Sequence, residues 1–182
     1  MRTSTKVAAG LGVAVAGALL TATRQRGKHP IGNRAVPEPA RSVNLNRYLG
    51  RWYEIARYEQ RFEQGCTNVT ADYRLRDDGR IEVLNSCRRP DGTLRVARGV
   101  ARTVSASNAK LKVRFFGPFL GDYWILDHGE DYSWSIVGEP SGRYLWILAR
   151  KSKPGSDMVE RLIERTVGMG YDRSMLILTK QT

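Results

Sequence analysis

The chain has little of the chemistry that catalysis and metal binding usually require. Its 182 residues include only two histidines, His29 and His128, and two cysteines. No cluster of His, Cys and acidic residues has the spacing of metal ligands. No nucleophile elbow, phosphate-binding loop or dinucleotide fingerprint occurs either. We therefore expect no catalytic residue, no metal and no cofactor, and we expect His128, in a predicted turn, to be a solvated surface residue.

Acidic residues are scarce relative to basic ones, with 18 Asp+Glu against 30 Lys+Arg and a net charge of +12. Such an excess first suggests nucleic acid or an anionic membrane. Residues 1–42 hold seven Lys/Arg and one acid, and residues 43–182 hold 23 and 17, so each part contributes +6. Because no aromatic stacking platform accompanies the charge, we expect no nucleic-acid partner.

The longest apolar run, residues 7–20, is shorter than the roughly 20 residues of a membrane-spanning helix. It follows Arg2 and Lys6, as in a secretory signal, but the basic residues at 24–28 would also suit an uncleaved anchor. We expect residues 1–23 to be a signal peptide or N-terminal membrane anchor. Residues 24–42, which contain three prolines, are expected to be a flexible linker.

Residues 43–182 read as one all-β domain. Apolar and polar residues alternate with a period of two in short segments, and turn signals such as Asp77-Asp78-Gly79 separate them. The expected strands are 51–58, 67–75, 81–86, 93–104, 111–115, 122–127, 132–138 and 144–150. A helix is expected from Pro154–Asp157 to Gly168, and a short strand at 175–178. Eight sequential strands close most simply as an antiparallel up-and-down barrel, with the helix packed outside.

A barrel of this size has room for packed side chains or for one small ligand. Small residues on inward positions, such as Ala71, Ala97, Gly99 and Ala101, would leave an apolar cavity. In the other interpretation, the large inward side chains simply fill the interior. From the alternation, the candidate ligand-binding residues are Val69, Ala71, Tyr73, Val83, Phe115, Tyr123 and Trp146.

Cys66 and Cys87 flank the first predicted hairpin, and in an exported protein such a pair suggests a disulfide. A two-residue turn at Asp78-Gly79 would place Cys66 opposite a position near Asp91, so the bond requires a bulge or a wider loop. The basic residues between 95 and 114 are interpreted as a solvated face or, alternatively, as contacts for anionic lipid headgroups. They are Arg95, Arg98, Arg102, Lys110, Lys112 and Arg114.

Four motifs, in order, resemble those of the lipocalins, in particular the bacterial lipocalin (Blc) and apolipoprotein D-like branch. They are residues 44–57 with Gly50-Arg51-Trp52, residues 115–119, Glu130-Asp131-Tyr132, and residues 144–150 ending in Arg150. The resemblance implies that Trp52 closes the barrel floor and that Arg150 stacks on it. The structural signature residues would be Gly50, Trp52, Asp131, Tyr132 and Arg150. Glu130 replaces the threonine of the family pattern.

The resemblance also implies a function. We expect a lipid-binding protein, not an enzyme, that stores or transports fatty acids or lysophospholipids for envelope maintenance under stress. The alternatives are an enzyme built on the same barrel, or a carrier of another hydrophobic ligand such as a tetrapyrrole. The expected location is the periplasm or the cell-envelope membrane, but residues 1–42 contain no cysteine for a lipobox, so a conventional lipoprotein anchor is not expected. A membrane surface is a further candidate partner, and both a monomer and a homodimer remain open.

Overall fold

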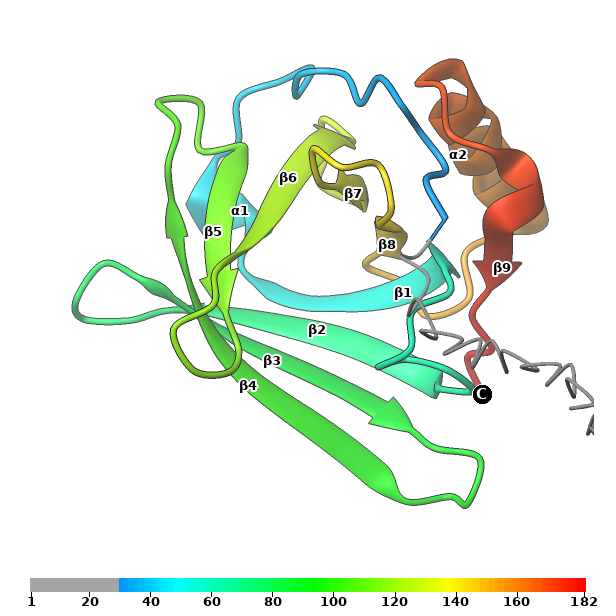
Figure 1. Cartoon of the computed structure of the whole chain (residues 1–182), viewed down its shortest axis with the longest axis horizontal. Coiled ribbons are helices and arrows are strands. Elements are labelled where there is room, and N and C mark those ends of the chain that lie inside the picture. Colours follow the sequence, from blue (N-terminus) through cyan, green and yellow to red (C-terminus); the bar gives the residue numbers. More distant parts are fainter. Residues whose placement is uncertain (1–29) are drawn as a thin grey trace, which may run out of the picture.

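The computed structural model describes residues 30–182, so the predicted signal or anchor at 1–23 and the first part of the linker lie outside the described residues. Within them, strand β1 pairs with β2 on one side and β8 on the other, which closes an antiparallel sheet of eight sequential strands into a barrel (Figure 1). The predicted fold is confirmed. The barrel strands are β1 (Gly50–Tyr58), β2 (Thr67–Leu75), β3 (Ile81–Arg88), β4 (Leu94–Thr103), β5 (Lys110–Arg114), β6 (Gly121–His128), β7 (Trp134–Gly138) and β8 (Leu145–Ala149).

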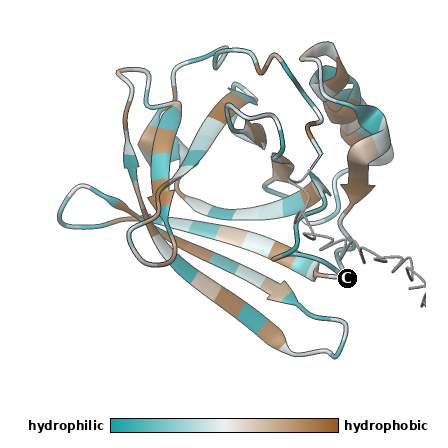
Figure 2. Ribbon diagram, in the orientation of Figure 1, coloured by the Kyte–Doolittle hydropathy of each residue, from teal (hydrophilic) through white to brown (hydrophobic). Residues whose placement is uncertain are grey.

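The period-two pattern explains why these segments form barrel strands. Figure 2 shows both hydrophobic and hydrophilic residues along β4, and successive side chains of this strand point to opposite faces of the sheet. Ala97 and Ala101 point inward and line the barrel interior, whereas Leu94 and Val96 point outward and are exposed. The hydrophobic core therefore lies inside the barrel, around Trp52 and the inward residues of the other strands.

The predicted C-terminal helix is α2 (Ser156–Gly168), and it packs on the outside of the barrel (Figure 1). Its Leu162 and Ile163 contact outward residues of β1 and β8, including Ile55 and Ile147. The helix ends at a Schellman motif, in which the Tyr171 N–H donates to the carbonyl of Thr166 and Gly170 adopts a φ of +93°. A 3-10 turn, η1 (Arg173–Met175), then leads into β9 (Leu176–Leu178), which pairs with the end of β1.

Residues 30–43 differ from the free linker expected for this region, because they run along the outside of the barrel. The N–H groups of Gly32 and Asn33 donate to the Gly142 carbonyl at 2.9 and 3.1 Å, and the Asn33 side chain donates to Met169. Further along, the Val43 N–H donates to Ser107. The contact at Gly142 is so close that an added Cβ would lie 1.7 Å from the Asn33 oxygen. We call residues 30–43 the N-terminal arm.

Up-and-down topology gives the barrel two different ends. The end that carries the β2–β3, β4–β5 and β6–β7 turns also holds the short helix α1 (Leu45–Tyr48), and we call it the floor. The loops β1–β2, β3–β4, β5–β6 and β7–β8 gather at the opposite end, which we call the mouth. The N-terminal arm joins the two ends, from Gly142 in the β7–β8 loop to Ser107 in the β4–β5 loop. Among the described residues, no helix is long and apolar enough to cross a membrane.

Candidate functional site: the barrel cavity

The floor is closed by Trp52 and Arg150. Trp52 is fully buried, and the guanidinium carbon of Arg150 lies 3.8 Å from the centroid of its ring system. Arg150 also donates hydrogen bonds to the backbone carbonyls of Arg47 and Arg51, at 2.7 and 2.8 Å. This geometry agrees with the stacked pair that the family resemblance implied. Gly50 adopts a φ of +91° beside the Arg150 guanidinium, a conformation that favours glycine.

The β6–β7 turn completes the floor, and here the expectation for His128 was wrong. His128 is buried, because its ring stacks on Tyr132 with centroids 4.3 Å apart, and the N-terminal arm covers it. Its ring nitrogens lie 2.8 and 3.2 Å from the carbonyl oxygens of Gly129 and Ser42. A position in a predicted turn indicates an exposed side chain, and no local sequence pattern indicates the long-range contact with Ser42. In the same turn, the Asp131 carboxylate accepts the Ser133 N–H.

Above the floor, the barrel encloses a cavity of about 500 Å³ that opens toward the mouth. All seven residues proposed from the alternation lie on its wall: Val69, Ala71, Tyr73, Val83, Phe115, Tyr123 and Trp146. The wall also includes apolar residues that were not proposed, among them Leu45, Leu49, Ile81, Leu111, Val113 and Leu148. The large inward side chains therefore do not fill the interior.

Three tyrosine hydroxyls form the polar part of the deep wall. The Tyr123 hydroxyl lies 2.7 Å from that of Tyr73 and 3.0 Å from that of Tyr48, which also lies 3.2 Å from the Ser135 hydroxyl. Burial raises the pKa of Tyr48 to about 12, and it raises the pKa values of Tyr73 and Tyr123 as well. The three groups are therefore neutral at physiological pH and can exchange hydrogen bonds with a ligand. Sequence analysis missed Tyr48 because it lies on α1 rather than on a strand.

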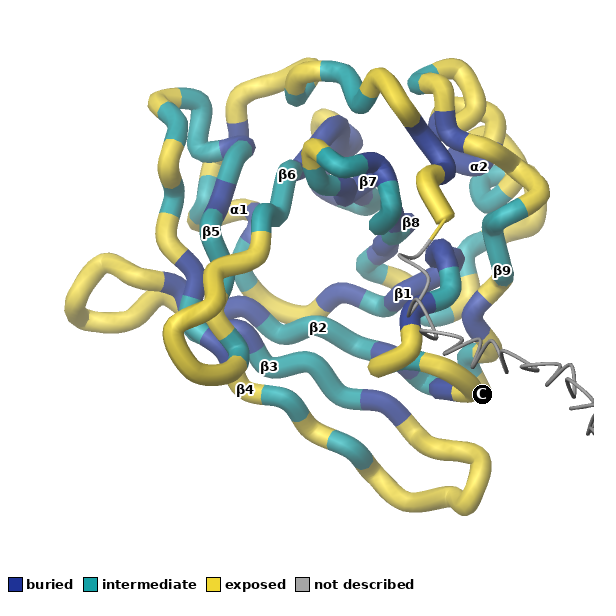
Figure 3. The backbone as a smooth tube through the Cα atoms, in the orientation of Figure 1, coloured by how far each residue is buried: buried dark blue, intermediate teal, exposed yellow. Residues whose placement is uncertain are grey.

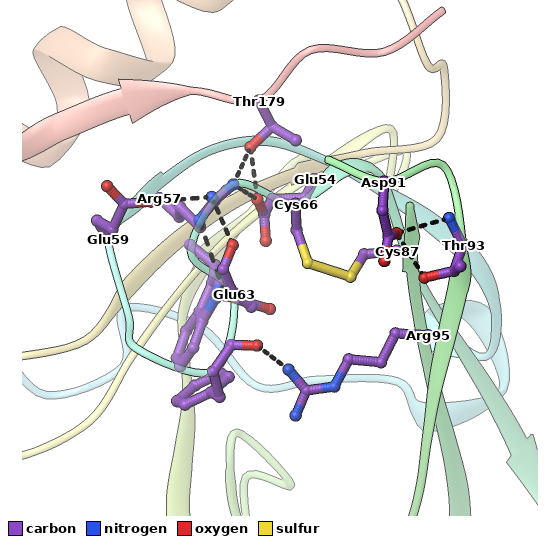
Figure 4. The surroundings of a disulfide bond; sticks show 12 residues. Glu54, Arg57, Glu59, Glu63, Cys66, Cys87, Asp91, Thr93, Arg95 and Thr179 are labelled. Carbon is purple, nitrogen blue, oxygen red and sulfur yellow. Dashed lines mark hydrogen bonds and ion pairs between the residues drawn. A yellow bond between two sulfur atoms is a disulfide. The ribbon is translucent and has the colours of Figure 1, made fainter. Parts of the chain in front are cut away.

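Closer to the mouth, two glutamates face one buried arginine (Figure 4). Arg57 donates to Glu54 at 2.8 Å, and its Nε lies 3.9 Å from Glu63, which accepts the Trp146 indole N–H at 3.1 Å. Thr179 donates a further hydrogen bond to Glu54. Burial, and the charge of Glu63, raise the pKa of Glu54 to about 8, and burial also raises the pKa of Glu63. One buried arginine shared by two carboxylates, of which Glu54 is almost fully buried, favours retention of a proton in this group.

The predicted disulfide between Cys66 and Cys87 is confirmed, and it ties the start of β2 to the mouth end of β3 (Figure 4). The register of the two strands shifts between Thr67 and Thr70, and Asn68 takes a φ of +50° within this irregularity. This is the bulge that the spacing of the cysteines required, and it brings their Cα atoms to 5.6 Å.

Of the six basic residues between 95 and 114, five occupy the outward positions of β4 and β5, and Arg95 is the exception. Arg95 points inward, lines the cavity and donates to the Phe62 carbonyl. Lys110 pairs with Glu38 of the arm and lies over the Trp124 ring, and Lys112 pairs with Asp122. The remaining three, Arg98, Arg102 and Arg114, are exposed.

Nothing in the described part of the chain forms a group of three or more metal-ligating side chains. The site is thus an apolar cavity with a closed floor, an open mouth and a few polar groups.

Comparison with known families gives a match over residues 43–181 to a model described as a lipocalin-like domain. The chain belongs to the lipocalin family.

Curated relatives place this lipocalin within the family. It is 40% identical over 147 residues to the outer membrane lipoprotein Blc of Vibrio cholerae, covering 79% of this chain and 86% of that protein. It is 39% identical over 153 residues to the protein of the same name from Escherichia coli K12, covering 80% and 86%. Apolipoprotein D of Macaca fascicularis is 34% identical over 161 residues, covering 83% and 84%. The predicted Blc and apolipoprotein D-like branch is therefore supported.

Solved structures agree on the fold. Insecticyanin from the tobacco hornworm Manduca sexta superposes with a TM-score of 0.63 at 21% identity, covering 80% of this chain and 84% of that one. Lipocalins are generally binding and transport proteins, and the family, its Blc and apolipoprotein D relatives and the fold support binding of a small hydrophobic ligand by this lipocalin.

Proposed function

We propose that this lipocalin binds fatty acids or lysophospholipids in the barrel cavity and stores or transports them in the cell envelope. The names of its relatives, outer membrane lipoprotein and apolipoprotein, support an envelope location and a lipid ligand. The apolar run at residues 7–20 supports export. In this proposal the lipocalin acts as a carrier, and the seven predicted wall residues contact the ligand.

The observation that carries the proposal is the cavity itself. A volume of about 500 Å³ lies within the range of small-molecule sites, and the wall is mostly apolar. Each methylene that leaves water for such a wall contributes about 0.8 kcal/mol. Burial of about ten methylenes then contributes roughly 8 kcal/mol, from which the cost of immobilising the ligand is subtracted. Micromolar binding requires about 8 kcal/mol after that subtraction, so an acyl chain must bury more than ten methylenes to reach it.

The polar groups are arranged for an amphiphile. The deep wall carries only neutral hydroxyls, from Tyr48, Tyr73 and Tyr123, whereas charged side chains line the cavity near the mouth, where Glu63 and Arg95 lie. A charged headgroup buried at the floor would lose its hydration without an opposite charge to replace it. We therefore place the acyl chain in the deep cavity and the headgroup at the mouth.

Two neighbouring residues of β4 provide the test. Ala97 points into the cavity and Val96 points to solvent, so Ala97→Phe fills part of the cavity and Val96→Phe adds the same ring outside it. Titration of the native tryptophan fluorescence with oleic acid and with a lysophospholipid measures binding. We expect Ala97→Phe to weaken affinity at least about tenfold, because the added ring occupies part of the cavity and the acyl chain can no longer contact that area of apolar wall.

The matched variant Val96→Phe should bind as the unmodified protein does. Equal affinity in all three proteins would show that the ligand lies outside the cavity and would contradict the proposal. Mass spectrometry of a solvent extract of the purified protein gives an independent measurement, because a carrier of this kind should co-purify with acyl lipid.

A further inference from the structure

The mouth of the barrel exposes large apolar side chains. Phe116 and Phe119, in the β5–β6 loop, are 71% and 81% exposed, and Leu120 follows them in the same loop. Phe62 in the β1–β2 loop and Leu94 after the β3–β4 loop are exposed as well. We call these five residues the mouth patch. Exposed apolar residues that stand singly are ordinary, but a group gathered at one end of a molecule indicates a contact surface.

The mouth patch is continuous with the cavity. Phe62 and Phe116 contribute to the cavity wall although both are exposed to solvent. The wall is also incomplete beside them, since β4 pairs with β5 only from Val100 to Thr103. Residues 94–99 of β4 thus have β3 on one side and, among the described residues, no strand on the other. Figure 3 shows the β3–β4 and β5–β6 loops as largely exposed. An apolar ligand leaving the cavity here would pass directly over the mouth patch.

Exposed arginines lie in or next to the same loops as the mouth patch. Arg61 lies in the β1–β2 loop, Arg88 and Arg89 lie at the β3–β4 loop, and Arg114 ends β5. We call these four residues the mouth arginines. The mouth arginines and the inward Arg95 are the five arginines of the stretches 59–66, 88–95 and 114–120. These stretches also contain three acids, so their net charge is +2.

The acids of these stretches offset the mouth arginines only in part. Glu59 and Glu63 both face the buried Arg57, at 3.5 and 3.9 Å, and the side chain of Glu63 is only 12% exposed. Asp91 is exposed and keeps its charge while it accepts hydrogen bonds from Thr93 within its own turn, so two exposed acids stand against the four mouth arginines. The exposed charge around the mouth patch is therefore predominantly positive.

This charge decides between two occupants of the surface. A second copy of the chain placed mouth to mouth would bring two sets of mouth arginines together, which is unfavourable. An anionic bilayer offers both of the required features, because its phosphates attract arginine and its interface accepts aromatic side chains. We propose that the mouth docks on an anionic lipid bilayer, with the mouth patch in the interface and the mouth arginines on the headgroups. The lipocalin would then exchange its ligand with the bilayer without passing it through water.

The proposed function supplies only the reason for docking, which is exchange of the ligand with the bilayer. The test must therefore distinguish loss of docking from loss of ligand binding. Phe119→Trp places a fluorophore in the mouth patch, and Leu75→Trp places one at the exposed floor end of β2 as a matched control. Both variants of the full chain are mixed with phosphatidylcholine vesicles that contain brominated lipid, with and without phosphatidylglycerol. We expect strong quenching of the tryptophan from Phe119→Trp on the anionic vesicles, and several-fold less from Leu75→Trp.

The charge is tested in the Phe119→Trp background. Adding Arg61→Gln and Arg89→Gln should lower the ratio of docked to undocked protein by about fivefold for each arginine. Arg74→Gln, on an exposed position of β2 away from the mouth, should leave it unchanged. High salt should weaken docking in the same direction, because it screens the attraction.

Three results would overturn the proposal. Equal quenching of the two introduced tryptophans would show that any vesicle binding comes from another part of the chain. Quenching that does not depend on phosphatidylglycerol would remove the role of the mouth arginines. Absence of quenching, together with a mouth-patch-dependent dimer in light scattering, would assign the surface to a second copy. Ala97→Phe should still dock, so loss of ligand binding and loss of docking remain distinguishable.

Discussion

Removal of the Arg150 guanidinium should destabilise the barrel more than the removal of an ordinary surface arginine. The side chain crosses the floor and contacts α1, β1 and the β6–β7 turn, where the Tyr132 carbonyl accepts a hydrogen bond from the Arg150 Nε. It lies 3.8 Å over the Trp52 ring, and it donates to carbonyls of α1 and the start of β1. The substitution Arg150→Met keeps the aliphatic stem of the side chain and removes these contacts.

The expected magnitude follows from the geometry. The Nη atoms reach the carbonyls of Arg47, Leu49 and Arg51 at 2.7 to 2.9 Å. Hydrogen bonds from charged donors contribute about 1.5–3 kcal/mol each, which we reduce to about 1 kcal/mol because the guanidinium is only partly buried. The contact with the Trp52 ring adds about 0.5–2 kcal/mol. We therefore expect Arg150→Met to lower the free energy of unfolding by about 3–5 kcal/mol.

Urea unfolding followed by far-ultraviolet circular dichroism measures this change, and a double-mutant cycle isolates the ring contact. The cycle combines Arg150→Met with Trp52→Leu, and the coupling energy should be about 0.5–2 kcal/mol. Arg150→Lys is the second control, because it keeps the charge but not the planar fork, and it should recover less than half of the loss. A coupling energy of zero within error, or full stability of Arg150→Lys, would refute this account of the floor.

Two further predictions concern the mouth end of the barrel. Replacement of Cys66 and Cys87 by serine should cost about 3 kcal/mol in oxidising buffer, because the bond closes a loop with a sequence separation of 21; a reductant should lower the unfolding temperature of the unmodified protein to that of the variant, and equal temperatures in oxidising buffer would contradict the expectation. The pKa of Glu54, about 8 in the folded protein against 4.5 ordinarily, means that the folded state holds a proton that the unfolded chain releases. Stability that is present near pH 4.5 should therefore decline by roughly 1–3 kcal/mol as the pH rises toward 8, and Glu54→Gln should flatten this profile, so an unchanged pH profile in that variant would remove Glu54 as the cause.

The strand pattern and the inward wall could be predicted because they depend on local alternation. Val69, Ala71 and Tyr73 occupy every second position of β2, and pairing with β3 keeps that face inward from Thr70 onward. Three of the four small inward residues line the cavity as expected. Gly99 does not, because the Phe115 ring occupies the space beside it and would lie 2.8 Å from an added Cβ.

The features that could not be predicted depend on contacts between distant segments. His128 is buried by Ser42, 86 residues away, and Glu54 joins Thr179 from the other end of the chain. The sequence of β1 alone shows a glutamate and an arginine three residues apart, which is equally typical of a solvated pair. Only the register shift between Glu54 and Ala56, and the docking of the C-terminal segment, bring them into the interior.

The position of the N-terminal arm determines which end of the barrel a tether or a fusion partner would lie beside. Because Gly32 is hydrogen-bonded to Gly142 in the β7–β8 loop, Pro30, the first described residue, lies toward the mouth end and not toward the floor. A tether attached at this point would hold the mouth close to the surface that carries the tether. It would favour the orientation in which the mouth, rather than the floor, faces that surface. A fusion partner joined at the same point would obstruct the mouth. A reporter or affinity tag that must leave the mouth accessible should therefore be inserted in the β2–β3 turn.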